Sequence, residues 1–178
     1  MTRMISRLAM TTISLALSAA TVFAADKTAG ERVDDSWLHT KVKSALVGEG
    51  SRNINVEVHE GVVQLAGFIK SDEARDAAIS EAGAVKGVVR ISNQLVVQPK
   101  SRTPGRVLDD GVIAGRVKGI LADDDSTSSI EINVEVNHGV VLISGFVDSA
   151  AERSAAERLA KGAKGVEGVI NGIEVAGS

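Results

Sequence analysis

Two hydrophobic patterns follow one another along the first half of the chain. Apolar residues recur at helical spacing over residues 36–47, which predicts an amphipathic helix. Over residues 54–65 apolar and polar residues alternate, which predicts two half-buried strands joined by a hairpin turn at Gly61. Ser71 is the expected N-cap of a second helix, and residues 88–97 have the composition of a further strand. The predicted order is therefore helix, strand, strand, helix, strand.

This order of elements occurs twice. A shift of 78 residues aligns residues 55–58 with residues 133–136, and the match continues without a gap to the C-terminus. Upstream the shift falls to 75 residues, so the second copy contains three extra residues, most simply within residues 123–129. A length change between a helix and a strand is typical of a surface loop.

The duplicated pattern predicts an α+β fold made of two tandem αββαβ modules. Each module is expected to be a three-stranded mixed sheet covered by two helices. The predicted modules span residues 34–98 and 108–176, with a linker at residues 99–107 whose prolines, glycine and charges favour independent folding. A unit of this size buries only about 60% of its chain surface on folding and is therefore marginally stable by itself. Docking would stabilise both modules, and it is the alternative to free movement.

The N-terminal residues have the features of an export signal. Arg3 and Arg7 precede an apolar stretch that ends in small residues at Ala24, which predicts a cleaved signal peptide at residues 1–24 and an N-terminal linker at residues 25–33. Removal of the two arginines lowers the formal net charge from −3 to −5. We therefore expect a periplasmic protein.

The composition argues against several classes of chemistry. Without cysteine there is no disulfide, thiolate nucleophile or Cys-ligated zinc, and an aromatic content of 2% gives little stacking surface for bases or cofactors. The histidines His39, His59 and His138 and the acidic run at residues 123–125 lack the spacing of metal sites, and we interpret them as solvated. We expect no enzymatic activity, no cofactor, no small-molecule substrate and no nucleic-acid partner.

Both copies contain residues that resemble a known family. Residues 35–46, 61–67 and 85–97 of the first copy, and residues 138–145 and 165–175 of the second, are similar to the BON domain, a bacterial module of αββαβ form. The two-copy exported arrangement resembles that of osmotically inducible periplasmic members. The resemblance implies no shared catalytic motif, and it implies attachment to phospholipid or envelope surfaces, with a chaperone-like role as another proposal.

Candidate lipid-binding residues follow from that implication. An indole suits the headgroup boundary and nearby cations attract anionic lipid. The candidates are Trp37, Lys41 and Lys43 on the first predicted helix, and Arg102, Arg106, Arg116 and Lys118 in and after the linker. The sequence favours a core position for Trp37 over a membrane-facing one, since an apolar helical residue is more often packed than exposed. The second copy has Val112 in its place.

The sequence thus predicts a non-enzymatic envelope protein that binds weakly to a membrane phospholipid surface. One alternative is a periplasmic holdase for unfolded envelope proteins, because a three-stranded sheet offers edges for strand addition. Another is a structural, oligomerising spacer. The oligomeric state stays open.

Overall fold

The structure, a computed structural model, describes residues 34–46, 51–98, 104–127 and 132–177, without the side chains of 51 and 104–108. The predicted signal peptide at residues 1–24, the segment 25–33 and residues 128–129 of the stretch expected to hold the extra residues lie outside this part of the chain. So does Arg102.

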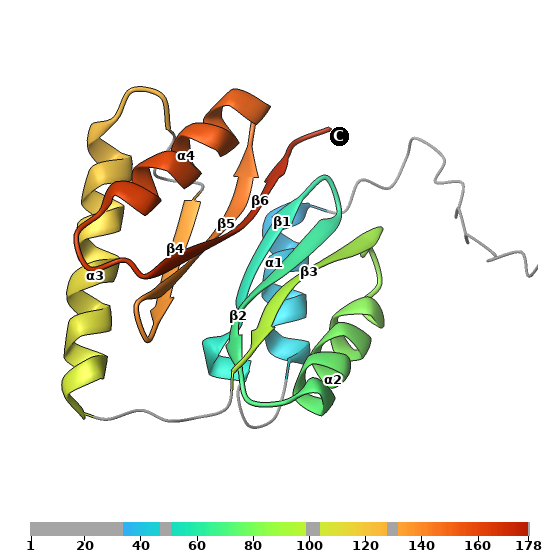
Figure 1. The fold of residues 1–178 in the computed structure, drawn as a ribbon. Helices are drawn as coiled ribbons and strands as arrows, with labels where there is room; N and C mark the ends of the chain where they lie inside the picture. Colours follow the sequence, from blue (N-terminus) through green and yellow to red (C-terminus); the bar gives the residue numbers. More distant parts are fainter. Residues whose placement is uncertain (1–33, 47–50, 99–103, 128–131, 178) are drawn as a thin grey trace, which may run out of the picture. The chain divides into compact units, whose positions relative to one another are not determined.

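Two modules with the same order of elements make up the described chain (Figure 1). Module 1 consists of α1 (Asp35–Ala45), a short 3-10 helix (Ser51–Asn53), β1 (Asn55–His59), β2 (Val62–Ile69), α2 (Asp72–Gly83) and β3 (Arg90–Val97). Module 2 consists of α3 (Pro104–Asp123), β4 (Ile132–Asn137), β5 (Val140–Val147), α4 (Ala150–Gly162) and β6 (Gly168–Val175). The central strand of each sheet pairs antiparallel with the strand before it and parallel with the strand after α2 or α4. The predicted α+β fold with two mixed sheets is confirmed.

Helix α3 begins earlier than the sequence pattern predicts. The second module was expected to begin at residue 108, but the helix starts at Pro104, within residues assigned to the linker. Proline is favoured in the first turn of a helix, because its fixed φ suits the helix and its missing N–H would have no intrahelical partner there. The second half of the predicted linker is therefore helical.

The hairpin turn of each module is held by an aspartate from its first helix. Glu60 and Gly61 both have positive φ, 49° and 77°, as a two-residue type I′ turn requires. The Asp35 carboxylate accepts hydrogen bonds from the amides of these two residues at 2.7 and 3.0 Å. Asp110 accepts the equivalent pair from His138 and Gly139 at 3.0 and 2.9 Å. The bonds tie the hairpin turn to the start of α1 in module 1 and to the second turn of α3 in module 2.

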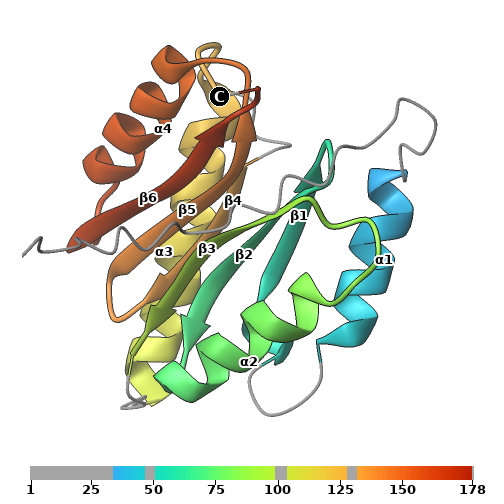
Figure 2. The ribbon, with the colours of Figure 1, turned by 90° about the vertical axis from the view of Figure 1, so that its right-hand side faces the viewer.

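Each module has its own hydrophobic core between its helices and one face of its sheet (Figures 1 and 2). In module 1, Leu38 and Val42 of α1 pack against alternate residues of β2, Val63 and Leu65. In module 2, Ile113 and Val117 of α3 occupy the matching positions. Ser71 accepts an amide hydrogen bond at the start of α2, as predicted. Its repeat equivalent Ser149 does the same at the start of α4.

The two modules dock through the sheet faces that carry no helices. A third apolar cluster joins Ala66 and Phe68 of β2 to Leu142 of β5, and all three are buried. Val96, Val140 and Ile170 pack around them, half-buried. The docked arrangement is thus the one present in this structure, of the two alternatives that the sequence left open. The reason is that the central strand of each sheet carries apolar residues on both of its faces.

Candidate functional site

Trp37 lies on the surface of module 1, so the core position favoured by the sequence is wrong. It sits in the first turn of α1, next to the fully buried Leu38, and 46% of its surface is exposed. The Lys41 ammonium lies 5.4 Å from the centroid of the indole ring, one helical turn away. This distance permits a cation–π interaction. An exposed indole and a neighbouring positive charge therefore lie side by side on the surface of module 1.

A second exposed apolar residue lies at the same end of module 1. Val89, in the turn between α2 and β3, is 60% exposed. Its amide donates to the Gly61 carbonyl at 2.9 Å, and a Cβ added to Gly61 would meet Val89 Cγ2 at 2.8 Å. Because Asp35 binds the amide of Gly61, the start of α1, the hairpin turn and Val89 are held together.

The equivalent end of module 2 forms a shallow pocket with different chemistry. Its lining includes Val112 and Arg116 of α3, Gly139 of the hairpin turn, and Lys164 and Glu167 after α4. Through the sequence repeat, these residues correspond to Trp37, Lys41, Gly61, Lys86 and Val89 of module 1. We call Trp37, Lys41, Lys86 and Val89 the Trp37 surface. Module 1 has an indole and a valine where module 2 has a valine and a carboxylate.

The remaining predicted lipid-binding residues do not form one patch with Trp37. The Lys43 ammonium donates to the Ile54 carbonyl at 3.4 Å, and both Lys43 and Lys118 act electrostatically on Glu135, at the contact between the modules. Arg116 donates to the carbonyl of Lys164 within the module 2 pocket. Arg106 lies on α3 with its side chain outside the described part. The structure brings together Trp37 and Lys41 from the predicted set.

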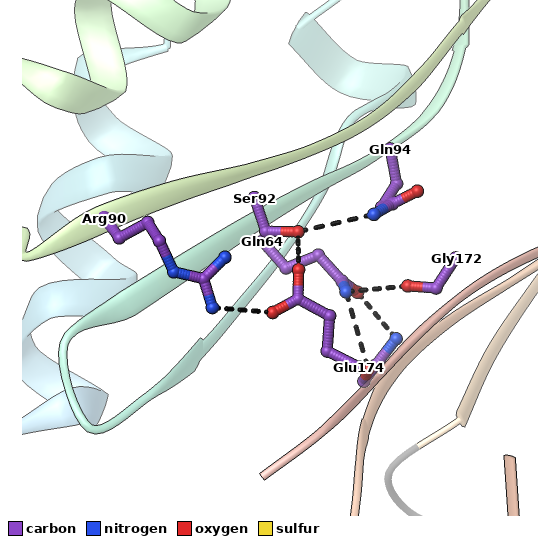
Figure 3. A network of polar contacts seen from close by, with 7 residues as sticks. Gln64, Arg90, Ser92, Gln94, Gly172 and Glu174 are labelled. Atoms are coloured by element: carbon purple, nitrogen blue, oxygen red, sulfur yellow. Dashed lines mark hydrogen bonds and ion pairs between the residues drawn. The ribbon is translucent and has the colours of Figure 1, made fainter. Parts of the chain in front are cut away.

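The polar contact between the modules is centred on Gln64, a residue that the sequence analysis missed (Figure 3). Its side chain is 1% exposed, and its amide nitrogen donates to the carbonyls of Gly172 and Gly145 at 2.9 and 3.4 Å. Its amide oxygen accepts from the Gly145 amide at 2.6 Å. Gln64 thus joins β2 of module 1 to the backbone of β5 and β6 of module 2, and both polar groups of its buried amide are hydrogen-bonded.

A charged group lies next to Gln64 at the same contact. Glu174 of β6 forms an ion pair with Arg90 of β3 at 2.9 Å and accepts a hydrogen bond from the Ser92 hydroxyl (Figure 3). Gln94 Nε2 donates to the same hydroxyl at 3.4 Å. Arg90, Ser92 and Gln94 therefore form a polar part of the contact on module 1. Glu174 is the charged residue of module 2 that lies opposite them.

Reciprocal bonds cross the contact at its other side. Asn55 donates to Glu135 at 2.6 Å, and Asn133 donates to Glu57 at 2.8 Å. Asn133 and Glu135 are the repeat equivalents of Asn55 and Glu57, so the two bonds are related by an approximate twofold axis. Burial raises the pKa of the Glu135 carboxyl, although hydrogen bonds from the Phe68 amide and Asn55 act in the opposite direction.

One of the two edge strands of each sheet, β3 or β6, has an outward amide occupied by a side chain. The Asn93 amide oxygen accepts from the Leu95 amide at 3.0 Å, and Asn171 does the same for Ile173 at 3.1 Å. Asn171 also donates to Glu157 of α4 at 2.9 Å, a bond that lowers the pKa of Glu157. These repeated asparagines reduce the number of free donors that an added strand would need.

The three histidines, interpreted from the sequence as solvated, are all half-buried. The His59 ring lies 5.3 Å from the ring of Phe146 in the other module, and His138 Nδ1 lies 2.8 Å from the side-chain oxygen of Asn137. Within the described ranges, no three histidine or acidic side chains converge as a metal site would require. Also within those ranges, no helix combines the length and apolar character needed to cross a membrane.

Comparison with known proteins gives matches over both modules. The BON domain model matches residues 34–99 and 109–177. Osmotically-inducible protein Y of Escherichia coli is 36% identical over 149 residues, which cover 82% of this chain and 74% of that protein. Outer membrane lipoprotein DolP of Haemophilus influenzae is 28% identical over 156 residues, covering 85% and 80%. The 21 kDa hemolysin of Actinobacillus pleuropneumoniae is 30% identical over 152 residues, covering 83% and 77%.

Proposed function

We propose that this chain, which belongs to the BON domain family, is a non-enzymatic periplasmic protein that binds weakly to anionic phospholipid through the Trp37 surface. The observation that carries the proposal is the exposure of Trp37 beside Lys41. The names of two relatives support an envelope role, since one is an outer membrane lipoprotein and another is osmotically inducible. We extend both associations, envelope location and stress, to this chain as part of the proposal.

The chemistry of the Trp37 surface suits a membrane interface. An indole favours the headgroup region, where its ring is partly desolvated and its N–H keeps polar partners. Val89 adds apolar area beside it, and Lys41 and Lys86 each contribute attraction of about 1 kcal/mol to an anionic surface. The whole chain has a formal net charge of −3, which opposes general adhesion to such a membrane. Binding is therefore local, weak and reduced by salt.

The single tryptophan of the chain makes the test direct, because all indole fluorescence comes from Trp37. The mature chain is titrated with vesicles of phosphatidylglycerol and phosphatidylcholine at low salt. We expect a blue shift of the emission, quenching by brominated lipid, and loss of both at high salt. Emission that stays unshifted and open to iodide at saturating lipid contradicts the proposal.

Matched variants separate the Trp37 surface from general charge. Lys41→Gln and Lys43→Gln each remove one positive charge from α1, but only Lys41 contacts the indole. We expect Lys41→Gln to weaken vesicle binding about fivefold, equivalent to about 1 kcal/mol, and Lys43→Gln to change it little. Equal effects of the two variants would indicate attraction by net charge alone.

A holdase role remains a second proposal with less structural support. Strand addition needs free backbone donors at a sheet edge, and Asn93 and Asn171 occupy one outward donor in each outer strand. Suppression of client aggregation by the chain without vesicles, at near-stoichiometric ratio, would support this role.

A further inference from the structure

The contact between the modules is formed by two unlike sheet faces, one from each module. The module 1 face consists of Gln64, Ala66, Phe68, Ser92 and Gln94, and the module 2 face consists of Leu142, Ser144, Ile170, Gly172 and Glu174. Because the two faces are related by an approximate twofold axis, two copies of the same face could in principle meet in the same geometry as the two unlike faces do. The residues that differ between the faces decide between them.

The reciprocal asparagine–glutamate bonds do not discriminate. Asn55 and Glu57 would find the same partners on a second module 1 as they find on module 2, because Asn133 and Glu135 are their equivalents. This part of the contact therefore favours association of any two modules in the observed geometry.

The position of Gly172 disfavours the pairing of two module 1 faces. Its equivalent in module 1 is Gln94. A Cβ added at Gly172 would lie 3.0 Å from Gln94 Cγ and 3.2 Å from Gln94 Cβ, closer than ordinary contact. Two module 1 faces would place one Gln94 against another at this point. Gln94 fits in the observed contact because the facing residue has no side chain.

Charge and hydrogen bonding exclude the pairing of two module 2 faces. Glu174 would face Gly168 and Ile170, the equivalents of Arg90 and Ser92, and would lose both of its partners. Leu142 would replace Gln64 and leave the Gly145 amide without its side-chain acceptor. Unpaired polar groups of this kind are how an interface rejects a wrong partner.

We propose that the two faces form a heterotypic recognition pair, and that a second copy of this chain is its partner in trans, by reciprocal exchange of modules. Each face of one copy then binds the unlike face of the other, and the dimer closes with two identical contacts. Pairing within one chain is favoured at low concentration, since a short connection gives an effective concentration in the millimolar range. Exchange therefore requires refolding at high protein concentration.

The absence of cysteine from the sequence allows a crosslinking test. The 3.2 Å between Gln94 Cβ and a Cβ at position 172 is close to the separation of about 3.5–4.5 Å found in disulfides. The double variant Gln94→Cys/Gly172→Cys, refolded at low concentration, should form an intrachain disulfide quantitatively. Failure to do so would overturn the docking geometry on which the proposal depends.

The decisive experiment mixes the single variants Gln94→Cys and Gly172→Cys, one of them labelled with 15N. The mixture is unfolded, refolded at high concentration and oxidised, and the disulfide-linked dimers are identified by mass spectrometry. Heterotypic exchange predicts that the dimer linking positions 94 and 172 strongly exceeds both homodimers. Random collision predicts that it makes up about half. A proportion of half or less, or no mixed dimer, would overturn the proposal.

Discussion

At one end of the fold, module 1 carries Trp37 and Val89 where module 2 carries Val112 and Glu167. The elements that support these positions are the same in both modules, including the aspartate that holds the hairpin turn. The difference therefore lies in surface chemistry and not in the scaffold. It teaches that a duplicated fold can keep its core while an exposed indole is confined to one copy.

The largest expected effect tests whether the two modules unfold together. Leu65→Ala in module 1 and its equivalent Ile143→Ala in module 2 each remove a fully buried side chain, which costs about 2–5 kcal/mol of the free energy of unfolding. Because the sheets are docked, we expect Ile143→Ala to shift the urea transition seen by Trp37 fluorescence as well as that seen by circular dichroism. A fluorescence transition unaffected by Ile143→Ala would show that the modules unfold independently.

A smaller effect is expected from the centre of the docked contact. Gln64→Leu gives module 1 the residue of module 2 and leaves the Gly145 amide and the Gly172 carbonyl without this partner. We expect a loss of about 1–3 kcal/mol in urea unfolding. Gln94→Ala is the control, with an expected change within about 0.5 kcal/mol because its hydrogen bond is long and stays within module 1. Equal losses would argue against a special role of Gln64.

The smallest effect concerns pH. Burial at the contact raises the pKa of Glu135 above its unfolded value, so the folded protein binds this proton more tightly. The stability that this carboxyl contributes is present at acidic pH and is lost as the pH rises through the folded-state pKa. In urea titrations from pH 4 upward, Glu135→Gln should flatten this dependence relative to the wild type. A dependence unchanged by Glu135→Gln would refute the assignment.

The sequence was sufficient for the fold because the apolar spacing of each element is regular. Leu38 and Val42 mark the core face of α1, and Ser71 and Ser149 mark the starts of α2 and α4. The docking of the modules was not predicted. Its signal was present in β2, where Ala66 and Phe68 alternate with core residues and make both faces apolar. The composition of the linker points the other way, towards modules that fold independently.

The candidate site was predicted less completely. Trp37 and Lys41 are four residues apart on a helix, and this spacing places them on neighbouring turns. Val89 comes from a different element, and only the hydrogen bonds through Gly61 bring it to the same end of the module. Whether Trp37 is buried depends on the width of the packed face, which sequence spacing does not determine.

Transfer of the Trp37 surface from one module to the other tests the central claim most directly. The variant combines Trp37→Val and Val89→Glu with Val112→Trp and Glu167→Val, so that the apolar residues move to the equivalent positions of module 2. The measurement is its binding to phosphatidylglycerol-containing vesicles, followed by the fluorescence of the transplanted indole. We predict a blue shift and an affinity within about threefold of the wild type, a difference of less than about 1 kcal/mol. A folded variant that does not bind these vesicles, while the wild type does, would contradict the claim that these side chains carry the membrane contact.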